Sequence, residues 1–304
     1  MNDSLREPEQ LGSPIVALHS FASANSQWDK LQIELENRAQ VHAIDLPEPG
    51  AIGDLEDSIT CSELTIEHLR RIIASDGSKI HLIGHSNAGS AALKLALQYP
   101  EMFKSITVYE PTVFHIAGTG NRIGNKLRQE FELMKDALFQ SRNGGTFDTG
   151  IEQFWKFWDS TEFWQQFSSE EKKEFSSKIE FVVSEIESCF SDNWWLEDLQ
   201  NLDVPVQVIM GMQSPLVFQN LAVQIVSALP AGRLTTLPMY GHFAPITHPE
   251  VINPLIIDHI CDAEHRQVGK KLEGNLPTGE RSSDREKKAG ILNRIRNSSF
   301  SFFS

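Results

Sequence analysis

The sequence predicts an α/β protein with a doubly wound, mostly parallel sheet and an inserted helical cap. Short apolar runs alternate with helical patterns up to residue 111 and again from residue 204. This alternation is typical of βαβ units in a parallel sheet. The residues between the two regions lack it and hold all but one of the six tryptophans. We therefore expect a core of residues 14–111 and 204–262 and a helical cap of residues 112–203.

Length and charge limit the classes of function. With 304 residues and 40% hydrophobic content, the chain can bury one large core. Its formal net charge of −14 argues against binding nucleic acid, which requires clustered lysine and arginine. No apolar stretch approaches the roughly 20 residues of a membrane span, and the first residues are polar. We expect a cytoplasmic protein without a membrane segment, and its oligomeric state stays open.

No motif for a metal or cofactor stands out. Cys61, Cys189 and Cys261 are widely spaced and lack CxxC spacing, so neither a disulfide framework nor a zinc site is predicted. Glycines between residues 118 and 124 resemble a phosphate loop, but no lysine followed by serine or threonine accompanies them. The expected partner is a small-molecule substrate.

The first elements follow a polar and loose segment, residues 1–13. Residues 14–18 predict a buried strand, and Ser26 is a candidate cap for a helix. That helix carries apolar side chains on one face: Trp28, Leu31 and Leu35. Residues 41–47 predict a second strand. The sequence Thr60-Cys61-Ser62-Glu63 is a capping box that opens another helix.

The stretch from Lys79 to Gly89 is a strand that turns into a helix within two residues. A serine at such a bend has a strained backbone and an exposed hydroxyl. The bend needs small neighbours, and Gly84, Ala88 and Gly89 flank Ser86. The spacing predicts a nucleophile elbow, with a helix cap as the alternative role of Ser86.

The remaining elements complete the alternation. We expect a helix over residues 88–99 and strands at 105–109, 204–211 and 233–237, with another helix between the last two. The terminal helix begins at Pro249 or at Pro254. Beyond it, residues 263–304 contain nine Lys+Arg and five Asp+Glu, and they predict a disordered, basic tail.

Residues Ser13 to Asp262 resemble the α/β-hydrolase family, in the helical-cap branch that contains esterases and carbon-carbon bond hydrolases. The ordered motifs that carry the resemblance are Leu18-His19-Ser20-Phe21 with Trp28, Asp45-Leu46-Pro47, Gly84–Gly89 and Gly241-His242. The family usually has His-Gly where this chain has His19-Ser20.

The resemblance implies roles for individual residues. Ser86 would be the nucleophile, and His242, in the loop after the last strand, would be the base. The histidine that follows, His248, is assigned to a helix start. The backbone N–H groups of Phe21 and Asn87 would form the oxyanion hole.

The acid of the triad is less clear from the sequence. The family's usual position, a few residues after Gly211, is occupied by Ser214. Some members carry the acid after the strand that follows the elbow helix, where this chain has Glu110. We therefore expect Glu110 to orient His242, with Asp192 and Asp198 as weaker candidates.

These residues predict a serine hydrolase that acts on a small to medium apolar ester, thioester, lactone or similar carbonyl substrate through an acyl-enzyme. Ser86 rather than aspartate disfavours chemistry that uses a carboxylate nucleophile. The alternative is a catalytically degenerate protein that binds a small apolar ligand or a partner without turnover. Ser20 and Ser214 are the departures from the family pattern that prompt this alternative.

Overall fold

The computed structural model describes residues 10–21, 23–46, 78–117, 122–142, 147–158, 165, 167–177 and 186–273. The chain divides into two compact units, residues 1–264 and 265–304. All strands and every predicted site residue lie in the first unit. The predicted capping box at residues 60–63 and its helix lie outside the described residues.

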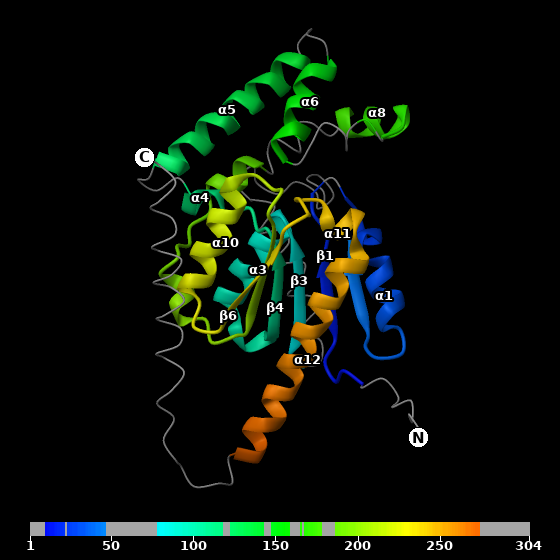
Figure 1. Ribbon diagram of the computed structural model, residues 1–304, viewed down its shortest axis with the longest axis vertical. Helices are drawn as coiled ribbons and strands as arrows, with labels where there is room; N and C mark the ends of the chain where they lie inside the picture. The colour runs from blue at the N-terminus through cyan, green and yellow to red at the C-terminus, as the bar shows by residue number, and fades with distance from the viewer. Residues whose placement is uncertain are drawn as a thin grey trace, which may run out of the picture. The chain divides into compact units, whose positions relative to one another are not determined.

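The first unit is built on one six-stranded sheet. Its strands are β1 (Ile15–Leu18), β2 (Val41–Ile44), β3 (Ile80–His85), β4 (Phe103–Tyr109), β5 (Val206–Gly211) and β6 (Gly232–Leu237). They are ordered β2-β1-β3-β4-β5-β6, and every neighbouring pair is parallel. The predicted fold class, a parallel α/β sheet, is confirmed (Figure 1).

Helices cover both faces of the sheet, so the strands are apolar on both sides. One face packs on α1 (Asp29–Leu35) and α12 (Pro249–Glu273), and the other on α3 (Asn87–Gln98) and α10 (Leu216–Ala228) (Figure 1). Along β1 the side chains alternate between the two cores, with Ile15 and Ala17 in the first and Val16 and Leu18 in the second. This alternation follows from the two-residue period of a strand.

A helical insertion separates β4 from β5. It contains α4 (Phe114–Ala117), α5 (Arg122–Arg142), α6 (Phe147–Trp158), α8 (Ser169–Ser177) and the 3-10 helix η3 (Asp198–Asn201). In Figure 1, α5, α6 and α8 lie together beyond one end of the sheet. That this insertion acts as a separate cap over residues 112–203 stays a prediction.

Short helices complete the core. They are η1 (Asn25–Trp28), η2 (Pro100–Met102) and α11 (Ala244–Thr247). Ser26 lies inside η1 and makes no cap, contrary to the sequence-based expectation, because the 3-10 turn begins one residue earlier. Trp28, Leu31 and Leu35 are all buried as predicted. No helix among the described residues combines the length and the apolar character needed to cross a membrane.

The terminal helix is longer than the sequence pattern indicated. It begins at Pro249, holds Pro254 in its interior and continues to Glu273. Residues 263–273, assigned from the sequence to a disordered tail, are therefore helical. Proline is accommodated at the first helical position, where its missing N–H has no partner to lose.

Candidate active site

The predicted elbow is present at the carboxyl end of β3. Ser86 joins β3 to α3 and has φ 59° and ψ −123°, a backbone conformation that non-glycine residues rarely adopt. A Cβ atom on Gly84 would lie 2.6 Å from the carbonyl oxygen of Ala88, and one on Gly89 would lie 3.2 Å from that of Gly84. The close approach of strand and helix excludes a side chain at position 84 and leaves little room for one at position 89.

Three predicted residues meet beside this bend. The Ser86 Oγ atom lies 3.0 Å from His242 Nε2, and His242 Nδ1 lies 2.7 Å from Glu110 Oε2. All three residues are buried, with at most 1% of their surface exposed. Serine, imidazole and carboxylate thus form one continuous chain of hydrogen bonds.

Glu110 is fixed at the end of β4 by the backbone of β5. Its Oε1 atom accepts a 2.6 Å hydrogen bond from the Gly211 N–H, which leaves Oε2 for His242. A Cβ atom on Gly211 would lie 2.1 Å from the carbonyl oxygen of Tyr240, so β5 presses directly against the loop that carries His242. Ser214, at the family's usual acid position, is buried near Glu110, but its hydroxyl makes no hydrogen bond of regular geometry with the described residues.

Residues next to Ser86 and Glu110 hold the His242 loop, and the sequence analysis did not assign them this role. His85 Nε2–H donates a 2.9 Å hydrogen bond to the carbonyl oxygen of His242. The Tyr109 hydroxyl donates a 2.7 Å bond to the carbonyl oxygen of Gly241. The one available signal was their position, since each directly precedes a predicted site residue.

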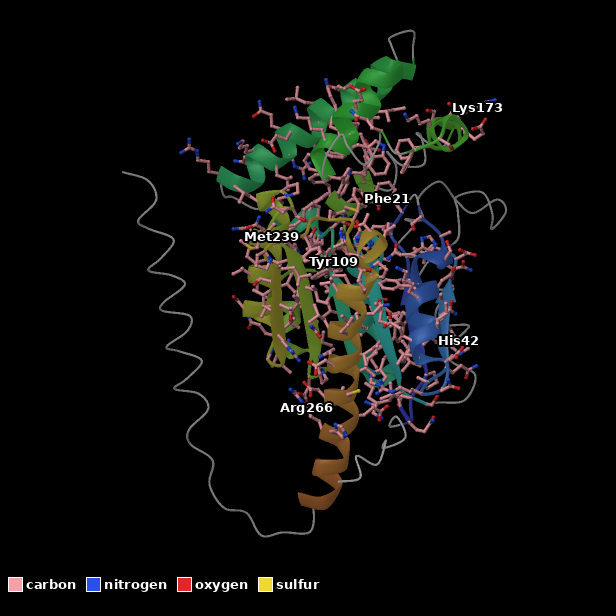
Figure 2. The ribbon with its side chains drawn as sticks, turned by 45° about the vertical axis from the view of Figure 1, so that its right-hand side comes forward. Phe21, His42, Tyr109, Lys173, Met239 and Arg266 are labelled. Atoms are coloured by element: carbon pink, nitrogen blue, oxygen red, sulfur yellow. The ribbon has the colours of Figure 1, made fainter. Side chains whose placement is uncertain are left out.

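Aromatic rings enclose the imidazole. The ring of Phe218 stacks on His242 at 4.6 Å with an interplanar angle of 28°, and Trp158 of α6 lies 5.1 Å away. The ring centroid of Phe21 lies 5.9 Å from that of Trp158 and 6.0 Å from that of Phe154. Figure 2 shows Phe21 between the sheet and the inserted helices. The surroundings of Ser86 are therefore apolar and shared between core and insertion.

Burial sets the charge state of the pair. It lowers the pKa of His242 from 6.5 to about 3, because a charged imidazolium loses its hydration among the aromatic rings. Burial also raises the pKa of Glu110 from 4.5 to about 8, although the nearby Ser214 side chain and the hydrogen bond from the Gly211 N–H oppose this shift. The neutral imidazole is the form that can accept a proton from serine.

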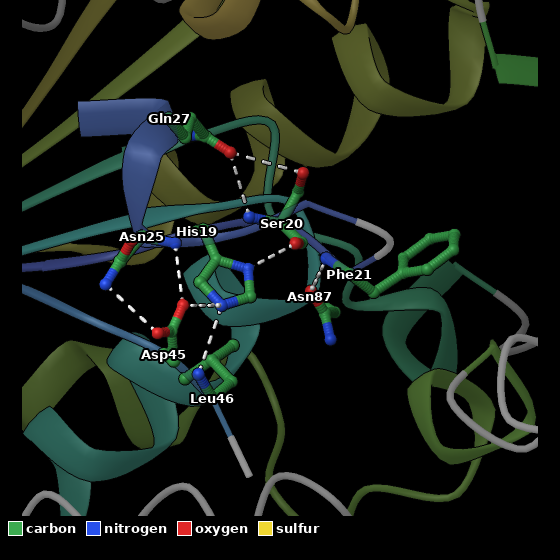
Figure 3. Close-up of polar contacts among 8 residues, drawn as sticks. All are labelled: His19, Ser20, Phe21, Asn25, Gln27, Asp45, Leu46 and Asn87. Atoms are coloured by element: carbon green, nitrogen blue, oxygen red, sulfur yellow. Dashed lines mark hydrogen bonds and ion pairs between the residues drawn. The ribbon is translucent and has the colours of Figure 1, made fainter. Parts of the chain in front are cut away.

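The predicted oxyanion loop is anchored in the core (Figure 3). Ser20 N–H donates a 3.1 Å bond to Gln27 Oε1, and Leu46 N–H donates a 3.0 Å bond to His19 Nε2. Ser20 has no positive φ, so serine replaces the family's glycine here without backbone strain. The Phe21 N–H points to Asn87 and donates a 3.0 Å bond to its side-chain Oδ1.

The weaker acid candidates have other partners. Asp192 forms a buried ion pair with Lys94, at 2.7 Å, and Asp198 accepts a 2.7 Å bond from the Trp195 N–H. His248 lies beside Thr247, whose hydroxyl is 2.8 Å from its Nδ1 atom. Within the described ranges, no group of three His, Cys, Asp or Glu side chains could hold a metal ion.

A second set of the same residue types lies at the amino ends of the strands. Ser105 Oγ lies 2.7 Å from His81 Nδ1, and His81 Nε2 lies 3.1 Å from Glu264 Oε1. Glu264 also pairs with Lys104. Ser105 lies inside β4, whereas Ser86 stands at a helix start, so the two serines differ in backbone geometry.

Two of the known proteins with similar sequences carry the name of a hydrolase or an esterase. Over 102 residues, 33% of this chain and 38% of the relative, the chain is 29% identical to a pimeloyl-[acyl-carrier protein] methyl ester esterase of Nitrosomonas europaea. It is 24% identical to the uncharacterized hydrolase YugF of Bacillus subtilis over 265 residues, covering 81% of this chain and 89% of that protein.

The fold also matches solved structures. A thermophilic esterase from Thermogutta terrifontis superposes with a TM-score of 0.60 at 17% identity, covering 84% of this chain and 92% of that one. The model of the alpha/beta hydrolase fold family matches residues 13–249, which include Ser86, Glu110 and His242. The chain belongs to the alpha/beta hydrolase fold family, as the sequence motifs predicted.

Proposed function

We propose that this hydrolase is a serine esterase that cleaves apolar carboxylic esters, thioesters or lactones through an acyl-enzyme. The observation that carries the proposal is the hydrogen-bonded chain from Ser86 through His242 to Glu110, at 3.0 and 2.7 Å. A serine hydroxyl is a weak nucleophile at neutral pH and needs an adjacent base, which this arrangement supplies.

Glu110 selects the reactive form of the imidazole. The ionised carboxylate accepts the Nδ1–H bond, which leaves Nε2 as the acceptor for the Ser86 proton. A protonated Glu110 would donate to Nδ1 and place the ring hydrogen on Nε2, where it blocks proton transfer. The carboxylate also stabilises the imidazolium that forms during attack.

The reaction follows from this geometry in two steps. Ser86 Oγ bonds to the carbonyl carbon while its proton moves to His242 Nε2. The tetrahedral intermediate then expels the alcohol or thiol, which takes that proton, and leaves Ser86 acylated. A water molecule then gives a proton to His242 Nε2 and attacks the acyl carbon. The bond from that carbon to Ser86 Oγ breaks, the imidazolium returns the proton to Oγ, and the carboxylic acid is released.

The aromatic surroundings support an apolar acyl group of small to medium size. Trp158 and Phe218 contact the His242 ring, and Phe21 contacts Trp158. Such walls favour hydrocarbon and exclude water from the reacting carbonyl. The curated relative that is a methyl ester esterase supports a carboxylic ester as the substrate class.

The test is covalent labelling combined with ester turnover. A fluorophosphonate should label the wild type at Ser86, and a p-nitrophenyl ester series of increasing acyl length should reveal the preferred size. Ser86→Ala should abolish labelling and turnover, and Glu110→Gln should lower kcat by on the order of 10³-fold or more. Near-normal turnover by Glu110→Gln would show that the acid is assigned wrongly.

Ser105→Ala is the matched control, because Ser105 is also buried and hydrogen-bonded to a histidine. It should keep both labelling and turnover per folded molecule.

Binding without turnover, the alternative function, is favoured by the hydrogen bond from the Phe21 N–H to the Asn87 side chain. Native wild-type protein that binds apolar esters but is neither labelled nor active would establish that alternative.

A further inference from the structure

We propose that the Asn87 side chain occupies the oxyanion site in the resting protein and must be displaced by the substrate. This proposal rests on the proposed function, because it concerns the N–H group of Phe21 as an oxyanion donor. The Asn87 Oδ1 atom accepts bonds from the Phe21 N–H at 3.0 Å and from the Ala88 N–H at 2.9 Å. A carboxamide oxygen thus lies where backbone donors from the loop and the elbow converge.

The orientation of the carboxamide is set by its neighbours. Both groups that face it are N–H donors, so the facing atom has to be the oxygen rather than the amide nitrogen. That oxygen carries partial negative charge, as the carbonyl oxygen of a bound ester does. The Asn87 side chain therefore mimics the substrate group that the proposed hole would bind.

The loop does not depend on Asn87 for its shape. Ser20 N–H is held by Gln27, and the His19 ring is held between the Leu46 N–H and the carbonyl oxygen of Ser20, as Figure 3 shows. These anchors come from the core side of the loop. Loss of the Asn87 bond should therefore release the Phe21 N–H and leave its position unchanged.

Competition for a single donor has a kinetic consequence. One N–H makes one well-aligned hydrogen bond, so an oxyanion 2.7 to 3.1 Å from Phe21 N requires Oδ1 to leave. The hydrogen bond given up is of ordinary net strength, which corresponds to a rate penalty of about 3- to 10-fold. Asn87 thereby lowers the basal rate of the esterase.

The experiment compares Asn87→Ala, Asn87→Asp and the wild type with an activated ester. Asn87→Ala should raise kcat/KM about 3- to 10-fold and tighten binding of an alkylboronic acid by a similar factor, because the boronate forms a tetrahedral adduct. Asn87→Asp should lower kcat/KM at least 10-fold, since a carboxylate binds the N–H groups more strongly and repels an oxyanion. Asn25→Ala, which removes an exposed side-chain bond to Asp45 at 3.0 Å, should change neither value.

Hydrogen exchange at the Phe21 amide provides a readout that does not need turnover. The exchange rate at Phe21 should increase in Asn87→Ala, while the amides of β1 and β3 keep their wild-type rates, and it should stay constant in Asn25→Ala. Unchanged exchange, or an Asn87→Ala enzyme no faster than an active wild type, would overturn the proposal while leaving the esterase assignment intact. A wild type that is neither labelled at Ser86 nor active would instead remove the proposed function and this inference with it.

Discussion

Ser86 and Glu110 share a rare backbone conformation: among the described residues, they are the non-glycine residues with positive φ, at 59° and 43°. Each directly follows one of two neighbouring parallel strands, β3 and β4. The Ser86 N–H donates to the carbonyl oxygen of Tyr109, and the Glu110 N–H donates to that of Ile209. The two strained residues are thus tied into adjacent strands, which turns both side chains toward His242.

The first prediction concerns the pH dependence of activity. Reaction requires neutral His242 and ionised Glu110. Because the pKa of His242 is lowered to about 3, the imidazole stays neutral across the usual assay range. The pKa of Glu110 is raised to about 8, so kcat/KM should rise as the pH rises toward 8 and then level off. A stopped assay from pH 5 to 9 measures this limb, and its persistence in Glu110→Gln would contradict the explanation.

The second prediction concerns the pH dependence of stability. Between pH 4.5 and about 8 the folded protein holds a proton on Glu110 that the unfolded chain has lost, so this contribution to stability declines as the pH rises. His242 acts oppositely, gaining stability from about pH 3 to 6.5. Of these two residues, only Glu110 changes the free energy of unfolding above pH 6.5. The free energy should fall by no more than about 1.4 kcal/mol per pH unit there.

Urea unfolding at pH 6.5, 7.2 and 8.0 measures this effect. The wild type should lose free energy of unfolding relative to Glu110→Gln as the pH rises over that range. A constant difference between the two proteins would show that Glu110 titrates alike in the folded and unfolded states.

The third prediction moves the acid. The Ser214 side chain is buried close enough to Glu110 to oppose the rise of its pKa, so a longer carboxylate side chain at position 214 should reach the same imidazole from the neighbouring strand end. Ser214→Asp alone should lower activity, because two carboxylates would share one buried site. The double variant Ser214→Asp/Glu110→Gln should have a kcat at least tenfold higher than that of Glu110→Gln alone. Equal activity of the single Glu110→Gln and the double variant would show that position 214 cannot orient His242.

The fourth prediction tests the contact between β5 and the histidine loop. In Gly211→Ala the added Cβ would lie 2.1 Å from the Tyr240 carbonyl oxygen, so backbone must move. We expect a loss of about 1 to 3 kcal/mol in unfolding free energy and at least a tenfold loss of kcat, since Gly211 also holds Glu110. Gly12→Ala is the control, because an added Cβ there would meet only Glu264 Oε2, at 4.0 Å. Wild-type kinetics in Gly211→Ala would contradict this role.

The fold and the proximity of Ser86, Glu110 and His242 could be predicted from the sequence for a physical reason. Apolar runs identify parallel strands, and the carboxyl ends of such strands meet at one edge. Any polar residue that directly follows a strand is therefore a candidate for the same site. Glu110 was chosen as the candidate acid in this way, although Ser214 occupies the family's usual position, and it lies 2.7 Å from His242.

Other features depend on distances that no pattern encodes. The Phe21–Asn87 bond and the Tyr109–Gly241 bond join residues 66 and 132 positions apart through single side-chain atoms. The approach of Gly211 to Tyr240 depends on how two loops pack. The helix end at Glu273 was missed because a polar, charged composition is equally compatible with an exposed helix and with a tail.

The set of Ser105, His81 and Glu264 bears on automated site matching. The serine lies beside Nδ1 in this set and beside Nε2 in the set around Ser86. A template that scores residue types and distances without distinguishing the two ring nitrogens would match both sets, with 2.7 and 3.1 Å against 3.0 and 2.7 Å. The distinguishing property is the bend at Ser86, which brings a nucleophile to a helix start, while Ser105 stays in a regular strand. When the ring nitrogens are not distinguished, the backbone dihedral angles of the serine separate the Ser105 set from the candidate active site at Ser86.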